Sequence, residues 1–273
     1  MLRNNFLALP LLLLLIFSLS TCVPPAHTPF KTALSALAGN KGLQSGPMIG
    51  YEDMLEVLIW VQSKGRASVE VIYWDIEKPE ALHHSNLVYT ELPAFTAKCI
   101  ANEVQPGKTY QYQVVINGGI VQLPYPATFK TQSLWQWRTD PPAFSFATGS
   151  CAFINEAEYD RPKPYGSNYQ IFTKIFDQKP DFMVWLGDNV YYREPDWNTK
   201  TGMVHRYTHS RSLPELQPLL ASTAHYAIWD DHDFGPDNSD ATWVNKEMAW
   251  EVFRDFWGNP TFGLNGQKGC TTM

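Results

Sequence analysis

The sequence predicts an α+β protein with two parts, an all-β segment over residues 47–133 and an α/β segment over residues 143–273. In the first part, short runs of β-branched and aromatic residues recur with turn residues between them, which is typical of strands. From residue 144 onward, strand patterns alternate with helical ones, which indicates a parallel sheet. Residues 134–142, rich in Trp and Pro, form the predicted linker between the two.

The amino terminus predicts export. Arg3 precedes an apolar run over residues 6–19, which together indicate a signal peptide over residues 1–22. The run is shorter than the roughly 20 residues of a membrane-spanning helix. Residues 19–22 resemble a bacterial lipobox, which would make Cys22 the lipid attachment site. Thr21 departs from the usual lipobox residue, so an ordinary signal peptide is the alternative, and only the lipid would contact a membrane.

The composition of the chain bears on which kinds of partner it binds. The 273-residue chain has a net charge of −6, which does not suggest a nucleic-acid-binding protein, although nucleic acid remains open as a substrate. Residues 23–46 are rich in Pro, Ala, Gly and Ser and are predicted to be a linker. After Cys22 the chain has three cysteines, and an odd number in an exported protein leaves at least one unpaired.

The all-β segment is expected to be a sandwich. Strands are predicted over residues 55–61, 68–74, 94–101 and 110–116. The turn leading into Tyr110 resembles the tyrosine corner of a fibronectin type III domain. Short strands at regular spacing support a sandwich of this type. Such a sandwich has no chemistry of its own, so we expect it to position or shield the second part.

The α/β segment supplies the candidate site. Strands are predicted over residues 144–148, 181–186 and 224–228, with helices over residues 169–176, 213–221 and 244–257. Each strand is followed by polar residues: Cys151 after the first, Asp188, Asn189 and Tyr191 after the second, and Asp230, Asp231, His232 and Asp233 after the third. Ligands of open α/β sheets bind beyond the carboxyl ends of the strands. We therefore expect the three clusters to meet at one edge.

The residue types favour a metal site. Carboxylates this close shift each other's pKa unless a cation compensates them. Carboxylate oxygens suit calcium, magnesium or manganese, whereas the thiolate of Cys151 and the phenolate of Tyr191 suit ferric iron. Asp188 is placed to bridge two metals. Two ions about 3.5–4 Å apart can clamp a phosphoryl group, so such a centre near His232 favours phosphate ester hydrolysis.

Three motifs resemble one known family. They are Gly149-Ser150-Cys151, Gly187-Asp188-Asn189-Val190-Tyr191 and Trp229-Asp230-Asp231-His232-Asp233. In this order they resemble the PhoD-like alkaline phosphatases of the metallophosphoesterase superfamily, and the resemblance extends over residues 47–273. It implies a fibronectin type III-like β-sandwich followed by an α/β metallophosphoesterase domain. It also implies an exported alkaline phosphatase or phosphodiesterase that hydrolyses phosphate esters with metal-activated water.

The resemblance also implies residue roles. Cys151, Asp188 and Tyr191 would bind Fe3+, and Asp188 would bridge to Ca2+. Asp231 would bind on the calcium side. His232 would contact the phosphate or protonate the leaving group, so Asp231 and His232 form the expected catalytic pair. Tyr192 adjoins Tyr191, and only the family pattern selects Tyr191.

Further candidates rest on weaker patterns. Asn238 is a candidate ligand of the second metal. Arg206 and Arg211 are candidates for substrate binding because a guanidinium group fits phosphate oxygens. The remaining histidines of this region belong to no motif, and we expect them to be surface or packing residues: His205, His209 and His225.

The α/β segment is expected to be incomplete. The superfamily builds its site from two α/β halves, and the second half supplies histidines. No histidine follows His232 in this sequence. We therefore expect a fragment of a longer protein with weak metal binding and little or no activity. The alternatives are an inactive fragment, a non-catalytic surface-binding lipoprotein, or a metallo-hydrolase acting on other esters.

Overall fold

The computed structural model describes residues 42–162 and 168–263. The predicted signal peptide, Cys22, most of the predicted 23–46 linker and Cys270 lie outside the described residues. Among the described residues, no helix has the length and apolar character needed to cross a membrane.

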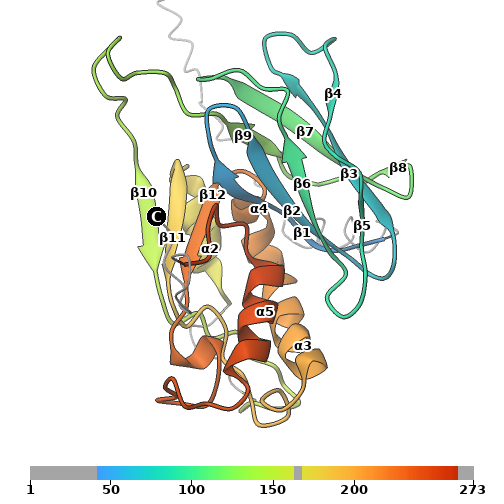
Figure 1. Ribbon diagram of the computed structural model, residues 1–273, viewed down its shortest axis with the longest axis vertical. Helices are drawn as coiled ribbons and strands as arrows, with labels where there is room; N and C mark the ends of the chain where they lie inside the picture. Colours follow the sequence, from blue (N-terminus) through green and yellow to red (C-terminus); the bar gives the residue numbers. More distant parts are fainter. Residues whose placement is uncertain (1–41, 163–167, 264–273) are drawn as a thin grey trace, which may run out of the picture.

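A six-stranded sheet runs through both predicted parts (Figure 1). Its strands, in spatial order, are β10 (Phe146–Gly149), β11 (Phe182–Leu186), β12 (Ala224–Ile228), β1 (Leu43–Glu52), β2 (Val57–Ser63) and β6 (Thr96–Ala101). Strand β1 pairs antiparallel with β2 and parallel with β12, where Ile49 faces Ala224. The all-β and α/β segments therefore share one sheet. Because β1 begins at Leu43, the end of the predicted linker belongs to this sheet.

A second sheet completes the sandwich. It is built from β3 (Ser68–Asp75), β4 (His83–His84), β5 (Val88–Tyr89), β7 (Thr109–Ile116), β8 (Gly119–Ile120) and β9 (Thr128–Lys130). Buried residues alternate along β3, as expected for a strand with one face in a core. The hydroxyl of Tyr110 accepts a hydrogen bond from the backbone N–H of Gln105 at 2.8 Å. This contact matches the predicted tyrosine turn.

Helices cover the other face of the large sheet. They are α2 (Gln170–Asp177), α3 (Lys200–Arg211), α4 (Gln217–Leu220) and α5 (Lys246–Phe256), with 3-10 turns η1 (Pro214–Leu216) and η2 (Asp231–Asp233). The single helix predicted over residues 213–221 is divided into η1 and α4. Pro218 lacks the N–H that would bond the carbonyl of Pro214, so a regular helix cannot continue there.

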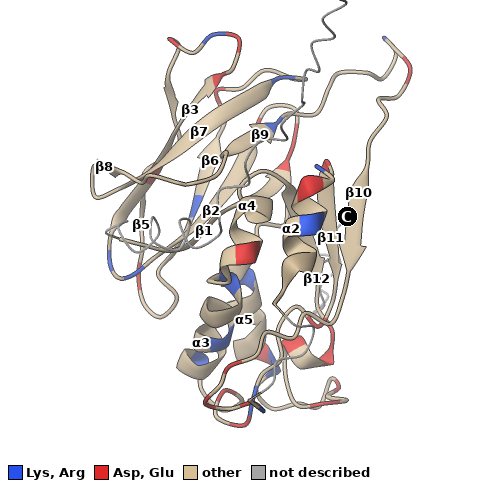
Figure 2. Ribbon diagram, turned by 180° about the vertical axis from the view of Figure 1, so that it is seen from behind, with Lys and Arg blue, Asp and Glu red and all other residues tan. Residues whose placement is uncertain are grey.

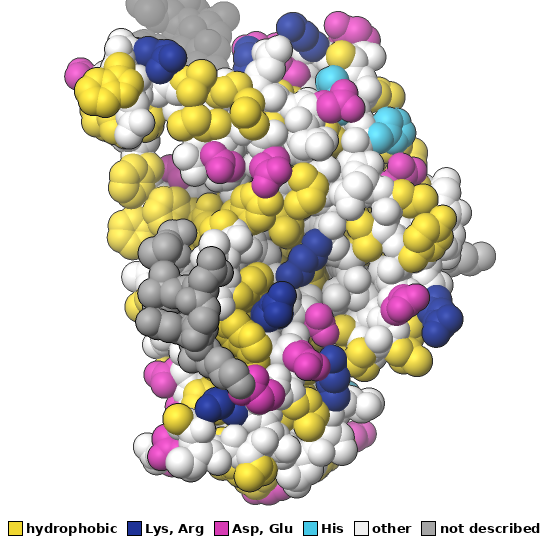
Figure 3. Space-filling model, in the orientation of Figure 1, with side chains coloured by type: hydrophobic (Ala, Val, Ile, Leu, Met, Phe, Trp, Pro, Cys, Tyr) yellow, Lys and Arg dark blue, Asp and Glu magenta, His cyan; other side chains and the backbone are white. Residues whose placement is uncertain are grey.

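The covering of the large sheet is uneven. Every residue of β2 is buried, because the second sheet covers one face and α5 the other. The indole of Trp60 on β2 donates to the backbone carbonyl of Asp255 at 2.8 Å. By contrast, Phe146 on β10 is 56% exposed and Leu186 on β11 is 47% exposed. Figure 3 shows hydrophobic side chains along the edge where Figure 1 places β10.

Candidate metal centre

The strand ends bring the predicted clusters together. Strands β10, β11 and β12 are parallel neighbours, with Phe146 facing Phe182 and Phe182 facing Ala224. Their carboxyl ends therefore lie at the same edge of the sheet, away from the sandwich (Figure 1). Figure 2 shows acidic residues gathered in the loops at this end of the molecule.

The backbone of these loops adopts unusual conformations. Cys151 has φ 59° and Asp188 has φ 51°, both in the left-handed region that is uncommon for residues other than glycine and is visited more often by asparagine and aspartate than by cysteine. Each such residue costs on the order of 1–3 kcal/mol and is concentrated at functional sites. Gly187, with φ 98°, is needed because a Cβ there would lie 2.6 Å from the Cβ of Asp230. The loop after β11 therefore packs directly against the loop after β12.

Asp233 fastens these two loops together. Its buried carboxylate accepts hydrogen bonds from the backbone N–H of Asn189 at 3.0 Å and of Asp230 at 2.9 Å. Burial raises the pKa of Asp233 to about 7. The sequence places Asp233 in the acidic cluster but gives it no role. Its position three residues after Asp230 forms a capping box, a signal that sequence reasoning can use.

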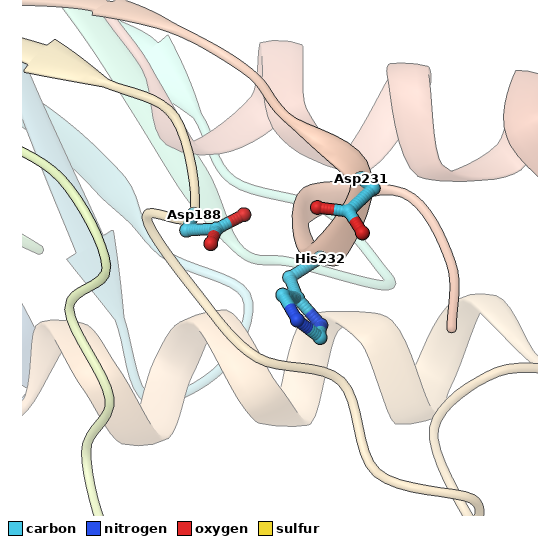
Figure 4. A group of neighbouring side chains, drawn as sticks. All are labelled: Asp188, Asp231 and His232. Atoms are coloured by element: carbon cyan, nitrogen blue, oxygen red, sulfur yellow. The ribbon is translucent and has the colours of Figure 1, made fainter. Parts of the chain in front are cut away.

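Asp188, Asp231 and His232 form the centre of the site. One ligand atom from each lies within 4.8 Å of the others. Figure 4 shows Asp188 on the loop after β11 and Asp231 and His232 on η2, all facing one space. Two carboxylates and an imidazole so close together are a donor set for a metal ion.

Cys151 and Tyr191 extend this group. The thiol of Cys151 lies 3.4 Å and the hydroxyl of Tyr191 2.9 Å from Oδ2 of Asp188. Burial, followed by the hydrogen bonds with Cys151 and Asp188, raises the pKa of Tyr191 far above its usual value. Tyr192 is instead buried in the core. The contact with Asp188 therefore belongs to Tyr191.

The site has an unfilled acceptor. Oδ1 of Asp188 is buried and has no hydrogen-bond partner among the described residues. Buried polar atoms are normally paired, and an unpaired one calls for an explanation such as an ion. The cluster of Asp188, Asp231, His232, Cys151 and Tyr191 thus fits a metal ion by both its donors and its unsatisfied oxygen.

Arg193 holds the two ligand-bearing loops. Its guanidinium group forms a two-pronged pair with the carboxylate of Asp160, at 2.9 and 2.5 Å. It also donates to the backbone carbonyls of Ile154 and Tyr191. Both members of the ion pair are buried. Arg193 therefore positions Tyr191 and the segment after Cys151, a role that no sequence spacing indicates.

Arg206 and Arg211, the candidates for substrate binding, are buried. Both lie on α3 with 0% and 4% of their surface exposed. Arg206 pairs with Glu156 at 2.7 Å and with Asp196 at 2.8 Å, and Arg211 stacks 3.8 Å from the ring centre of Trp257. Burial lowers the pKa of Arg211 to about 10. Both guanidinium groups therefore have partners inside the protein, and their contact with phosphate stays a prediction.

Asn238 reaches the site through its backbone. Its N–H donates to Oδ2 of Asp231, while its side-chain amide donates to Asp237 at 2.6 Å. The described contacts thus place its backbone, and not its side chain, at the cluster. The side chain of His232 lies 3.3 Å from Asp237.

The three other histidines of the α/β segment lie outside the cluster. His225 is buried, accepts from the indole of Trp185 at 2.9 Å, and has its pKa lowered by burial to about 3. His205 pairs with Glu156 at 2.9 Å. His209 contacts the carbonyl of Asn155. They are surface or packing residues, as predicted.

Comparisons with known proteins agree with the fold. Residues 40–134 match the family model described as a domain of unknown function (DUF7800). A solved structure titled "Structure of PhoD" is similar with a TM-score of 0.67 and 15% identity, over 86% of this chain and 49% of that one. This chain thus spans about half the length of that PhoD chain. No curated protein matches the chain by sequence.

Other solved structures match smaller shares of this chain. A human fibronectin type III domain matches with a TM-score of 0.27 and 15% identity, over 42% of this chain and 88% of its own. The sensor domain of the anti-sigma factor RsgI4 of Pseudobacteroides cellulosolvens matches with a TM-score of 0.26 and 20% identity, over 32% and 90%. The chain therefore shares the mixed α+β fold of PhoD, and identity at this level shows the fold alone.

Proposed function

We propose that this protein is a metal-dependent phosphoesterase of the PhoD type. The observation that supports this most directly is the meeting of Asp188, Asp231 and His232 at the ends of two parallel strands. The fold shared with PhoD is consistent with it. The substrates proposed are phosphate monoesters, diesters or both.

Two metal ions fit the proposal. Cys151 and Tyr191 together with Asp188 would hold Fe3+, and Asp188 with Asp231 would hold Ca2+. The thiol and phenol protons that now point to Asp188 would be released, since metal ligands bind in their deprotonated forms. When bound, such ions lower the pKa of water so that hydroxide is available near neutral pH.

The protein residues would divide the remaining work. His232 lies next to the carboxylate cluster and is partly exposed, so it can contact a phosphate oxygen or hold a proton for the leaving group. Its ring packs against Tyr191 at 4.2 Å between ring centres. Arg193 and Asp233 keep the loops in place, which limits the motion of the catalytic groups.

We also propose that the protein is exported. The support is the predicted signal peptide over residues 1–22. Mass spectrometry of the protein from its native membrane fraction would test Cys22 as the lipid attachment site. An N-terminal diacylglyceryl-cysteine at residue 22 is expected, whereas cleavage at another residue without lipid would rule the anchor out.

The function is tested by metal loading and turnover. The full chain is titrated with Fe3+ and Ca2+ in a calorimeter, then assayed with a chromogenic phosphate monoester and diester. Asp188→Ala is expected to lower metal affinity at least about 100-fold, since it removes the shared ligand. Asp240→Ala is the control, because Asp240 is an exposed acid that caps the turn at Thr242.

The outcomes separate the rival functions. Metal binding with turnover that is lost in both Asp188→Ala and His232→Ala supports the phosphoesterase. Metal binding without turnover, even in the complete gene product, favours a non-catalytic binding protein. Equal turnover of carboxyl and phosphate esters favours a hydrolase of other esters. Metal affinity unchanged by Asp188→Ala would disprove the site assignment.

A further inference from the structure

A pocket lies at the ends of strands β11 and β12 that are opposite the metal centre. It has a volume of about 350 Å3 and is lined by Phe182 and Ala224, the first residues of β11 and β12. The sandwich contributes the end of β1 and the segments around Lys108 and Lys130. The pocket is therefore separate from Asp188 and Asp231, which follow the other ends of β11 and β12. Its volume is within the range of small-molecule sites, which begins at roughly 300 Å3.

Aromatic rings form one wall of this pocket. They belong to Trp135, Phe144, Phe182 and Tyr226. The ring centres of Phe144 and Phe182 are 5.7 Å apart, and those of Phe182 and Tyr226 are 6.1 Å apart. Such faces suit an apolar body, and they attract a cation through the negative face of each ring.

The charges around the pocket are unbalanced. Lys130 already pairs with Asp181 at 3.0 Å. Lys108 pairs with Glu77 at 2.5 Å and lies 3.9 Å from Asp75. Each lysine that lines the pocket is thus already paired, Lys108 with Glu77 outside the lining and Lys130 with Asp181 within it, and Glu52 is the remaining carboxylate of the lining.

Glu52 has no cationic partner of its own. One of its oxygens accepts from the backbone N–H of Lys130 at 2.9 Å. Among the described residues, no Lys, Arg or His nitrogen lies within 4 Å of its carboxylate, and Lys130, the nearby cation, is already paired with Asp181. Burial raises the pKa of Glu52 to about 8. A carboxyl group in this setting gains a favourable partner when a cation enters the pocket.

We propose that this pocket binds a small organic ammonium compound with an apolar body. The ammonium group would lie against Glu52, and the apolar body would pack on the rings of Phe144, Phe182 and Tyr226. Charge complementarity distinguishes this occupant from an anion or a neutral apolar molecule. The site does not depend on the metal centre, so it would persist if the proposed phosphoesterase activity were absent.

The test compares three probes of similar size. Benzylamine, benzyl alcohol and benzoate are titrated into the full chain near pH 8.5, where Glu52 is largely ionised, and affinities are measured by calorimetry and by shifts of backbone amide resonances. Benzylamine is expected to bind at least about tenfold more tightly than the other two, a difference of about 1.4 kcal/mol. Shifts are expected at Lys108, Thr109, Lys130 and Thr131.

Substitutions at Glu52 and Phe144 test which side chains produce the preference for benzylamine. Glu52→Gln is expected to abolish the preference for benzylamine, whereas Glu80→Gln, an exposed acid outside the pocket, leaves it unchanged. Phe144→Leu, at an exposed wall residue, is expected to weaken benzylamine binding about threefold while sparing the fold. It provides a second test if Glu52→Gln does not fold.

Several results would overturn the proposal. They are equal affinity for amine and alcohol, no benzylamine binding at millimolar concentration, and resonance shifts outside the pocket. Undiminished amine binding in Glu52→Gln would also overturn it. A metal-loading failure would not, because the metal centre and this pocket lie at opposite strand ends.

Discussion

The two halves of the large sheet are covered differently. Strands β1, β2 and β6 lie between the second sheet and the helices, and every residue of β2 is buried. Strands β10 and β11 have helices on one face only, and Phe146 and Leu186 are exposed on the other. We call β1, β2 and β6 the inner half of the sheet, and β10 and β11 the outer half. Packing in the inner half therefore contributes most to the stability of the fold.

The backbone conformation also distinguishes the two halves of the large sheet. The outer strands end in Cys151 and Asp188, both at positive φ, beside a buried carboxylate oxygen without a partner. Such features cost stability and are tolerated where the surrounding structure is firm. The well-packed inner half therefore supports a strained outer edge, where the candidate site lies.

The largest expected effect is at Trp60 in the inner half. Trp60→Ala removes a fully buried ring between β2 and α5 and its hydrogen bond to Asp255. The free energy of unfolding is expected to fall by about 3–5 kcal/mol. Chemical denaturation followed by circular dichroism measures this. A loss below about 1 kcal/mol would show that the inner half does not dominate stability.

A smaller effect is expected at Arg193, on the outer side. Arg193→Ala leaves Asp160 buried without its partner, and breaking a buried ion pair costs about 3 kcal/mol. Because Arg193 also bonds the backbone of Tyr191 and Ile154, amide exchange of both segments should accelerate. Lys200→Ala, which breaks the surface pair with Glu251, is the control and should cost at most about 1 kcal/mol. Equal losses in both variants would contradict a positioning role.

The next prediction concerns the pH dependence of stability at Glu52, the last residue of β1, which pairs with β12. Its folded pKa of about 8 lies above the ordinary value of 4.5, so the folded state holds more protons between these values. Its contribution to stability is therefore present at low pH and is lost as pH rises from about 4.5 to 8. The charged and titratable groups near Glu52 are Lys130, Asp181, Tyr112 and Tyr226.

The corresponding variant is Glu52→Gln. It is expected to flatten the decline in stability over this pH range. Between pH 5 and pH 8.5 the variant should lose at least about 1 kcal/mol less unfolding free energy than the wild type. Denaturant titrations at five pH values measure the difference. Parallel pH curves for the two proteins would mean that Glu52 is ionised in the folded state.

The smallest effect is expected on the uncovered face. Phe146→Thr replaces a side chain that is more than half exposed on the edge strand β10. The unfolding free energy should change by no more than about 0.5–1 kcal/mol, while self-association measured by sedimentation should decrease, since exposed apolar edges promote it. A loss comparable to that of Trp60→Ala would mean that this face is packed against other parts of the chain.

The sequence alone determined much of the site. Runs of β-branched residues marked the strands that become β2, β3 and β7, and polar residues after three strands marked Cys151, Asp188 and Asp231. Both signals are local, because strand alternation and strand-end position are read from neighbouring residues. The role of Tyr191 came from a family resemblance, and the structure brings its hydroxyl to Asp188.

Tertiary structure decided the rest. The sequence missed α3, whose apolar residues lack a clear helical stripe because its buried face includes Arg206 and Arg211. It also could not show that β1 pairs with β12, or that Arg193 bonds Asp160 across 33 residues. A guanidinium group looks alike in sequence whether it faces phosphate or a buried carboxylate. Only packing between distant segments fixes which partner it has.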